Sequence, residues 1–453
     1  MAGFSRLLQE TLGATSSQLV ASAYMELTRF EKRRITRNGG RLDCPTRKRD
    51  RVTMGKIYRN MGEPMFRRAF RMSYFNFKVL YDTIKQSILR VMNDPKPKSN
   101  APNGRIPLSS RLGIAIRFFA GGDPYDIHVL FGVSYTEVFR SVDIIVDAVN
   151  STSSLDITFP TDHEEQKKLA GEFESISAAG FKGCCGCIDG LLIWIHRPSQ
   201  NECAAIGIGS TPFYCGRKHK FSLNLQALCD RHLRFTDISI LFGGATSDTL
   251  AFELSSMKHK LDTPGFLSPG LFIVGDNAYL NTPFLATPFP NVRGSAEHES
   301  RDSYNYYHSN LRIRIECAFG VLTQRFGFLR KKAPMKYSVK KTIATVSCLC
   351  RLHNFIINCS LAANDSDNSM PAPHTDLDSF RLYREGAAPI EAIPITQDSN
   401  YVPQLSDVGH HSDDHDRTAM QRHITQEARR NNRDLPRDTL HNIVVEQDLR
   451  RPQ

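Results

Sequence analysis

The strongest constraint on the fold is the alternation of strand-like and helix-like segments across residues 165–358. Residues 271–275 read Leu-Phe-Ile-Val-Gly, and a short, almost wholly apolar run of this kind is typical of a central strand buried on both faces. Further strands are predicted over 183–195, 220–228 and 233–241, and helices over 247–261, 309–325 and 339–359. This alternation is typical of an α/β or α+β domain.

A helical region precedes that domain. Helices are predicted from about residue 64, over 110–120, after Asp123-Pro124, and from Ser134. The stretch 125–140 resembles a helix-turn-helix, with Gly132 in the turn and Ser134 as N-cap of the recognition helix. That helix would expose Thr136, Glu137 and Arg140, a thin set for reading bases because Glu137 repels phosphate. A small bundle that only packs on the next domain fits these residues equally well.

Positive charge is concentrated near the amino terminus. The net charge is +11, and residues 29–71 hold 15 basic and 4 acidic residues, whereas residues 360–416 hold 2 basic and 11 acidic ones. A dense basic segment attracts phosphate backbone by releasing counterions, although a solvated arm without a partner would look the same. The charge pattern favours a nucleic-acid partner.

Composition excludes several other classes of protein. No run of about 18 apolar residues indicates a membrane span, and the first 25 residues lack a secretory signal, so neither a membrane partner nor secretion is expected. Eleven cysteines in 453 residues are too few for a disulfide scaffold and indicate reduced thiols. The expected organisation is a basic arm (1–56), a helical domain (57–155), an α/β domain (165–358) and an acidic, mostly disordered tail (360–453).

Three acidic residues lie where carboxylates are usually avoided. Asp189 stands inside an apolar strand and is followed by Gly190, which permits close approach of a ligand. Asp276 follows the central strand at its carboxyl end, where α/β sheets bind ligands. Glu316 borders an apolar helical stripe and could simply pair with Arg312 four residues earlier. Separately, each has an ordinary structural explanation: a capped bulge, a helix N-cap and a surface ion pair.

Together the three carboxylates suggest a metal site. Converging oxygen donors suit Mg²⁺ or Mn²⁺, and two such ions can activate a nucleophile and stabilise the leaving oxygen in phosphodiester cleavage. A basic arm would hold the nucleic acid.

Several ordered motifs between residues 186 and 355 resemble those of a known family. The matching stretches are Gly186-Cys-Ile-Asp-Gly190, Gly216-Arg-Lys218, Phe221-Ser-Leu-Asn-Leu-Gln-Ala227, Arg234-Phe-Thr-Asp237, Gly243-Gly244, Ser247-Asp-Thr249, Gly275-Asp-Asn-Ala-Tyr279, Arg314-Ile-Glu-Cys-Ala-Phe-Gly320 and Leu352-His-Asn-Phe355. In this order they resemble the DDE superfamily endonuclease domain of PIF/Harbinger-type transposases and their domesticated relatives.

The resemblance implies a ribonuclease-H-like mixed sheet flanked by helices, preceded by a small helix-turn-helix-like domain. It also implies a catalytic, metal-binding triad of Asp189, Asp276 and Glu316 that uses Mg²⁺ or Mn²⁺. Double-stranded DNA is the implied substrate and the nucleus the implied location. A Myb-like DNA-binding protein is the partner often seen in this family, and assembly into a homo-oligomer is left open.

Two motifs depart from the family pattern. The second acid usually stands in Gly-Asp-Ser-Gly-Tyr, whereas this chain has Asn277 and Ala278 after Asp276. The family's His-Asp-Ser is Ser247-Asp248-Thr249 here, which makes Asp248 a fourth acidic candidate, although N-capping the following helix is its preferred role. The triad is intact, so loss of catalysis is not indicated.

Other polar residues allow two interpretations each. Arg217, Lys218 and Lys220 could touch phosphate or form a solvated turn, and Asn224 and Gln226 could support the site by hydrogen bonds. The spacing of Cys184 and Cys187 also suits zinc, but no second pair follows, so buried strand cysteines are preferred. His353 is expected to be a packing residue, and Trp194 part of the core.

Three functions remain compatible with the sequence. The first is a metal-dependent DNA endonuclease or transposase. The second is a catalytically retired transposase that serves as a DNA- or protein-binding module. The third is a metal-dependent phosphohydrolase of small substrates, for which the basic arm would be dispensable.

Overall fold

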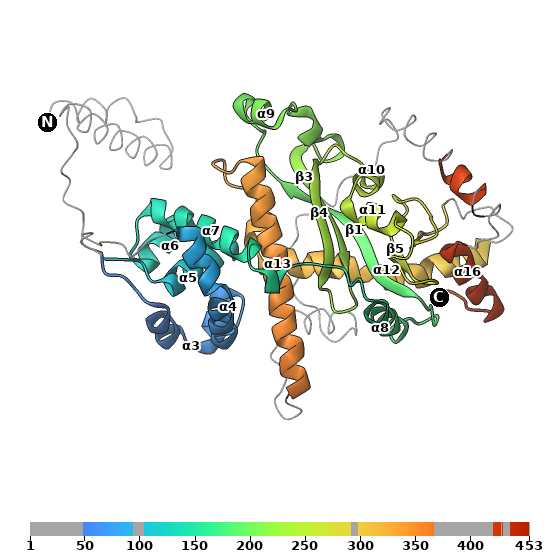
Figure 1. Ribbon diagram of the computed structural model, residues 1–453, viewed down its shortest axis with the longest axis horizontal. Helices are drawn as coiled ribbons and strands as arrows, with labels where there is room; N and C mark the ends of the chain where they lie inside the picture. Colours follow the sequence, from blue (N-terminus) through green and yellow to red (C-terminus); the bar gives the residue numbers. More distant parts are fainter. Residues whose placement is uncertain are drawn as a thin grey trace, which may run out of the picture. The chain divides into compact units, whose positions relative to one another are not determined.

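The structure is a computed structural model that describes residues 49–93, 104–290, 298–366, 420–426, 428 and 435–452 (Figure 1). The chain divides into two units, and every element described below belongs to the second, which spans 51–97 and 106–453. Most of the predicted basic arm and much of the acidic tail lie outside the described residues. Within the described ranges, no helix is long and apolar enough to cross a membrane.

Five helices form the helical region, each bounded by the residues that local chemistry requires. They are α3 (Met54–Phe70), α4 (Tyr74–Met92), α5 (Leu108–Phe119), α6 (Pro124–Phe131) and α7 (Tyr135–Asn150). The side chains of Ser73, Asp123 and Ser134 accept backbone N–H bonds as N-caps of α4, α6 and α7. The first helix begins ten residues before Pro64, because Gly62 (φ 68°) lets the chain kink and continue.

The helix-turn-helix segment has the local geometry that its sequence suggests. Gly132 ends α6 in the left-handed conformation (φ 61°), and α7 starts directly after Ser134. Glu137 forms ion pairs with the buried Arg111 at 3.0 Å and with Arg140 at 3.3 Å. Because two arginines neutralise Glu137, this carboxylate does not present an isolated negative charge to a phosphate backbone.

The second part of the chain is built around a six-stranded mixed sheet. Its strands are β1 (Cys184–Trp194), β2 (Tyr214–Cys215), β3 (Lys220–Cys229), β4 (Phe235–Gly243), β5 (Phe272–Val274) and β6 (Leu285–Ala286). The order is β2-β3-β1-β5-β6, with β4 also paired to β3. Strands β1, β3 and β4 run antiparallel, whereas β1, β5 and β6 run parallel. The expected α/β class, with a ribonuclease-H-like mixed sheet and a preceding helical region, is confirmed.

Helices pack on both faces of this sheet (Figure 1). They are α8 (His163–Glu174), α10 (Asp248–Glu253), α11 (Ser256–Asp262), α12 (His298–Arg325), α13 (Val339–Ser366) and α16 (Pro436–Glu446). The short helix α9 (Gln200–Ile206) has no buried residue. Cys187 of β1 lies in one buried cluster with Leu311 of α12, whereas Ile188 lies in a second cluster with Phe252 of α10. We call these two sides the α12 face and the α10 face.

Two helix predictions differ from the structure. The stretch 247–261 is two helices rather than one, because Ser255 accepts the N–H of Lys258 at 3.2 Å and caps a new start. Helix α12 begins at His298, eleven residues before the apolar stripe that predicted it. Its added turns are covered by the C-terminal segment.

Part of the segment expected to be a disordered tail is ordered. Helix α13 runs on to Ser366, and α16 contacts α12 and β6. Beyond α16, the Arg451 N–H donates to the Ser303 hydroxyl at 3.1 Å, and Arg450 pairs with Glu299 at 2.8 Å. The last described residues therefore hold the first turns of α12. A further helical segment covers residues 420–426.

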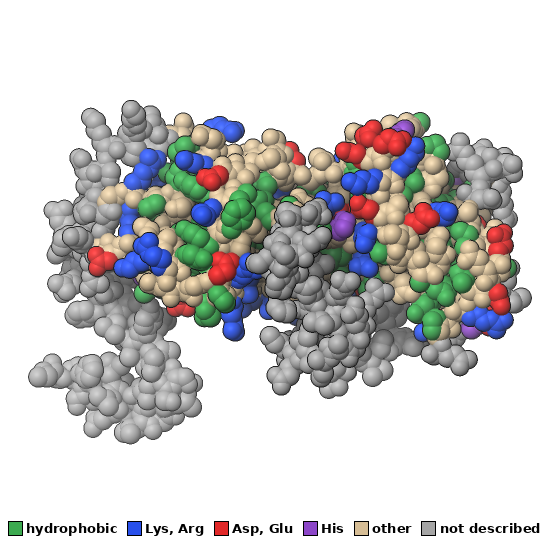
Figure 2. Space-filling model, turned by 90° about the horizontal axis from the view of Figure 1, so that it is seen from below, with side chains coloured by type: hydrophobic (Ala, Val, Ile, Leu, Met, Phe, Trp, Pro, Cys, Tyr) green, Lys and Arg blue, Asp and Glu red, His purple; other side chains and the backbone are tan. Residues whose placement is uncertain are grey.

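The described surface carries charges of both signs. On the face shown in Figure 2, Lys and Arg side chains lie among Asp and Glu, and the hydrophobic side chains lie in small groups between them. Phe75, Val129 and Met335 are the most exposed of the large hydrophobic side chains in the described residues.

Candidate active site

The strand register brings the first two predicted acids together. Strands β1 and β5 are parallel neighbours in which Cys187 is opposite Val274. Asp189 comes two residues after Cys187, and Asp276 comes two residues after Val274. The two acids therefore stand side by side on the α12 face, where neighbouring strands lie about 5 Å apart. The two carboxylates that the sequence separates by 87 positions are adjacent in the fold.

Asp189 has an environment that disfavours its negative charge. Burial raises the pKa of this carboxyl from 3.8 to about 7; the Gly190 N–H bond opposes this shift, the charge of Asp276 adds to it, Arg312 opposes it, and Asp248 adds to it. The Gly190 N–H donates to Asp189 Oδ1 at 2.7 Å. A partly buried carboxylate with its pKa raised in this way takes up a proton or a cation near neutral pH.

Glu316 reaches the same site through Arg312. Both residues lie on α12, and the Arg312 guanidinium contacts Glu316 Oε1 on one side and Asp189 Oδ2, at 3.4 Å, on the other. The Glu316 side chain is 48% exposed and Arg312 is 20% exposed. The sequence suggested the Arg312–Glu316 pair as an ordinary surface contact, but Arg312 in fact bridges the strand acid and the helix acid.

Asp248 approaches the site from the α10 face. Ser247, not Asp248, is the N-cap of α10, because the Ser247 hydroxyl accepts the Leu250 N–H. The preferred sequence interpretation of Asp248 as an N-cap is therefore wrong. Its Oδ1 instead accepts hydrogen bonds from Asn224 Nδ2 at 3.0 Å and Gln226 Nε2 at 2.8 Å.

This polar network is buried and closed by Tyr279. The Tyr279 hydroxyl donates to Gln226 Oε1 at 2.6 Å, and Gln226 Nε2 also donates to Asn224 Oδ1 at 2.9 Å. Burial raises the pKa of Tyr279 well above its usual value, and the charges of Asp248, Asp189 and Asp276 raise it further, so the phenol stays protonated. The sequence suggested the supporting role of Asn224 and Gln226, which the hydrogen bonds confirm, but it did not indicate Tyr279.

Gly190 lies between Asp189 and the hydrogen-bonded network around Asp248. A Cβ at this position would stand 2.2 Å from Asp248 Oδ1 and 2.7 Å from Gln226 Nε2. Only the absence of a side chain lets the Asp248 carboxylate pack against the backbone of β1, one residue from Asp189.

The donor set is chemically suited to a hard divalent cation, but its members are not gathered around one point. Among the residues that the structure describes, no three His, Cys, Asp or Glu side chains stand close enough to hold one ion. Asp189 and Asp276 offer adjacent oxygens, whereas Glu316 is turned to Arg312. Asp189 and Asp276 would supply two oxygen ligands, and Glu316 would supply a third if it leaves Arg312.

The other candidate ligands have structural roles. Cys184 and Cys187 are fully buried, and burial raises the pKa of both thiols well above the usual range. His353 is also buried, with Nε2 against the Leu233 carbonyl at 2.8 Å and Nδ1 against Arg325 at 3.2 Å. These contacts confirm the interpretations of buried strand cysteines and of a packing histidine.

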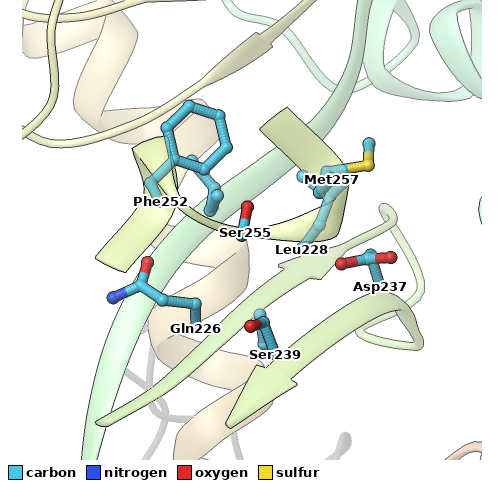
Figure 3. A pocket seen from close by; sticks show the side chains of 9 residues that line it. Gln226, Leu228, Asp237, Ser239, Phe252, Ser255 and Met257 are labelled. Carbon is cyan, nitrogen blue, oxygen red and sulfur yellow. The ribbon is translucent and has the colours of Figure 1, made fainter. Parts of the chain in front are cut away.

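A cavity on the α10 face is too small for a substrate. It measures about 10 Å³ and lies between β3, β4 and the helices α10 and α11, lined among others by Gln226, Asp237 and Phe252 (Figure 3). That volume is about the space that one water molecule needs. Burial raises the pKa of Asp237 to about 6 against the opposing charge of Lys260, 3.7 Å away.

One protein family matches the part of the chain that carries the three acids. The family described as DDE superfamily endonuclease matches residues 188–354, a range that contains Asp189, Asp276 and Glu316. Residues 188–354 therefore resemble a DDE superfamily endonuclease domain, and the resemblance noted in the sequence is confirmed.

A curated relative extends the likeness beyond this domain. The Protein ALP1-like of Arabidopsis thaliana is 24% identical over 317 residues, covering 67% of this chain and 73% of that protein. No solved structure matches the chain.

Proposed function

We propose that the protein is a metal-dependent DNA endonuclease or transposase, in which Asp189, Asp276 and Glu316 hold Mg²⁺ or Mn²⁺. The observation that carries the proposal is the side-by-side placement of Asp189 and Asp276 on parallel strands within the endonuclease match. The raised pKa of Asp189 supports it, because a buried carboxylate beside a second one favours a bound cation. We further propose double-stranded DNA as the substrate and the nucleus as the place of action.

Each group in the site would have a distinct task. When bound, divalent cations would activate the attacking hydroxyl and stabilise the leaving oxygen of the phosphodiester. Asp189 and Asp276 would present oxygens from rigid strands, and Glu316 would supply the third carboxylate from α12. Asn224, Gln226 and Tyr279 fix the Asp248 carboxylate behind β1, where its charge adds to the attraction for a cation.

Glu316→Gln tests the member of the triad that is most easily explained by a purely structural role, its ion pair with Arg312. Wild-type protein is expected to cut duplex DNA, including candidate transposon ends, in Mg²⁺ or Mn²⁺ and not in chelator. Glu316→Gln is expected to lower the rate about 10²-fold or more, because metal ions supply several kcal/mol of transition-state stabilisation. Glu299→Gln, the same change on the same helix at an exposed pair with Arg450, is the control and should cut normally. Equal rates for Glu316→Gln and wild type would remove Glu316 from the site.

Arg312→Met is expected to tighten Mn²⁺ binding by about tenfold. The guanidinium neutralises Asp189 and occupies Glu316, so its removal leaves both carboxylates without this competing charge. Titration calorimetry on metal-free protein measures the affinity. Arg67→Met removes an Arg–Glu pair of the same spacing on α3 and should leave Mn²⁺ binding unchanged. Weaker or equal affinity in Arg312→Met would show that Arg312 does not compete with the metal.

The ion pairs of Arg312 also favour a second function. Carboxylates that an arginine already neutralises suit a retired transposase that only binds DNA or a protein partner, such as a Myb-like DNA-binding protein or further copies of this chain. That protein would bind duplex DNA with steep salt dependence. Its DNA affinity would be the same in wild type and Glu316→Gln, and neither would cut in either metal.

A further inference from the structure

Three segments that are far apart in the sequence meet at the carboxyl end of β1. The Ala333 N–H donates to the Trp194 carbonyl at 2.9 Å, which places residues 331–332 beside this strand end. The Ile195 N–H donates to the Phe221 carbonyl at 3.0 Å, and Lys220 is paired with Cys215, which places the 217–220 turn at the same end. Residues 196–197 follow Ile195, the first residue after β1.

These segments carry almost only positive charge. Residues 196–220 and 327–341 contain ten Lys and Arg and a single acidic residue, Glu202. The Glu202 carboxylate accepts the Val339 N–H at the start of α13, so it is already engaged. We call the six exposed cations nearest the end of β1 the basic rim: Arg197, Arg217, Lys218, Lys220, Lys331 and Lys332.

The basic rim lacks acidic partners among the described residues. Within this part of the chain, none of its six side chains forms an ion pair. Lys220 instead lies over the Trp194 ring, 5.3 Å from its centre. Like charges held together without counter-charges repel one another, and this repulsion is relieved when a polyanion binds.

The basic rim is placed to contact DNA that reaches the acids. Trp194 is five residues along β1 from Asp189, or about 17 Å at the rise of a strand. That separation corresponds to about five base pairs of duplex. Beyond the rim, Lys336 lies 5.1 Å from the ring centres of both Tyr135 and Phe139 on α7, so the basic surface continues to the helix-turn-helix segment.

We propose that the basic rim binds the phosphate backbone of duplex DNA about half a helical turn from the bond placed at Asp189. This inference rests on the proposed function for the identity of its ligand. The rim would hold the duplex through phosphates and not through bases, so its contribution would be independent of DNA sequence and strongly dependent on salt.

A quadruple variant tests the rim without cleavage. Arg217→Gln, Lys218→Gln, Lys331→Gln and Lys332→Gln are combined in full-length protein carrying Asp189→Asn, and duplex DNA binding is followed by fluorescence anisotropy in chelator over a range of salt. Affinity is expected to fall at least about tenfold near 0.1 M salt, and the slope of log affinity against log salt to shrink by about 3 to 4. The melting temperature of each variant reports that it folds.

A matched variant removes the same charge elsewhere. It changes four residues on α8 and near the opposite end of β1 to Gln: Lys167, Lys168, Lys182 and Arg231. Two of them, Lys167 and Lys182, already have carboxylate partners. An equal loss of affinity in both quadruple variants, or no loss in the rim variant, would overturn the proposal. So would a rim that discriminates in favour of duplex RNA. If wild-type protein binds DNA through the basic rim but does not cut it, the proposed nuclease function is wrong, whereas the proposed binding role of the rim is supported.

Discussion

Asp189→Asn should abolish metal-dependent DNA cleavage while leaving the fold intact. The loss is expected to reach about 10³-fold or more, because the variant lacks a charged oxygen ligand for ions that supply several kcal/mol at the transition state. Cleavage rates of wild type and Asp189→Asn in Mg²⁺ and in Mn²⁺, under single-turnover conditions, measure the effect.

The stability of the same variant separates chemistry from folding. Asp189 is partly buried, with a pKa raised to about 7, so its ionised form destabilises the metal-free fold. A neutral asparagine of the same size should therefore keep or raise the melting temperature measured in chelator, and Mn²⁺ should raise it less than in wild type. Asp262→Asn, at an exposed pair with Lys258, is the control and should retain cleavage. Undiminished cutting by Asp189→Asn would end the proposed role of this residue.

Gly190→Ala should damage the site through a single methyl group. Its Cβ would stand 2.2 Å from Asp248 Oδ1, so the Asp248 carboxylate or the backbone of β1 must move. Overpacking of this kind costs about 1–3 kcal/mol of unfolding free energy. Because Gly190 adjoins Asp189, we also expect cleavage to fall about 10²-fold, as misplacement by about 1 Å does in other enzymes.

Gly171→Ala provides the matched comparison. Gly171 lies within α8, and a Cβ there would meet nothing within 4 Å. Alanine is favoured over glycine inside a helix by about 1 kcal/mol, so this variant should be as stable as wild type or more so. Denaturant unfolding and the cleavage assay are applied to both variants. If Gly190→Ala and Gly171→Ala have the same unfolding free energy and the same cleavage rate, the close packing of Asp248 against β1 does not matter for function.

Local chemistry explains what the sequence could predict. The strands around Asp189 and Asp276 were predictable because apolar runs bounded by glycine and polar residues have few alternatives, and all four predicted strands are present. The helix starts at Asp123 and Ser134 were predictable because each side chain satisfies a backbone N–H within three residues.

The remaining features depend on contacts between distant parts of the chain. Arg312 pairs with Glu316 by helical spacing, but its second contact, with Asp189, spans 123 positions and follows from how α12 crosses β1. Asp248 looks like a helix cap in sequence because it begins α10, whereas its hydrogen-bond donors, Asn224 and Gln226, come from β3. Side-chain pairing across the sheet leaves no local signal.

The contacts of the C-terminal segment bear on how the protein matures. Arg450 and Arg451 bind the first turns of α12 across about 150 positions of chain, and Glu316 lies farther along the same helix. During translation, those first turns cannot be covered until residue 451 has left the ribosome. Completion of α12 is thereby postponed until residue 451 has been made, and a nascent chain that stops at residue 354 would lack the contacts of Arg450 and Arg451 with the first turns of this helix.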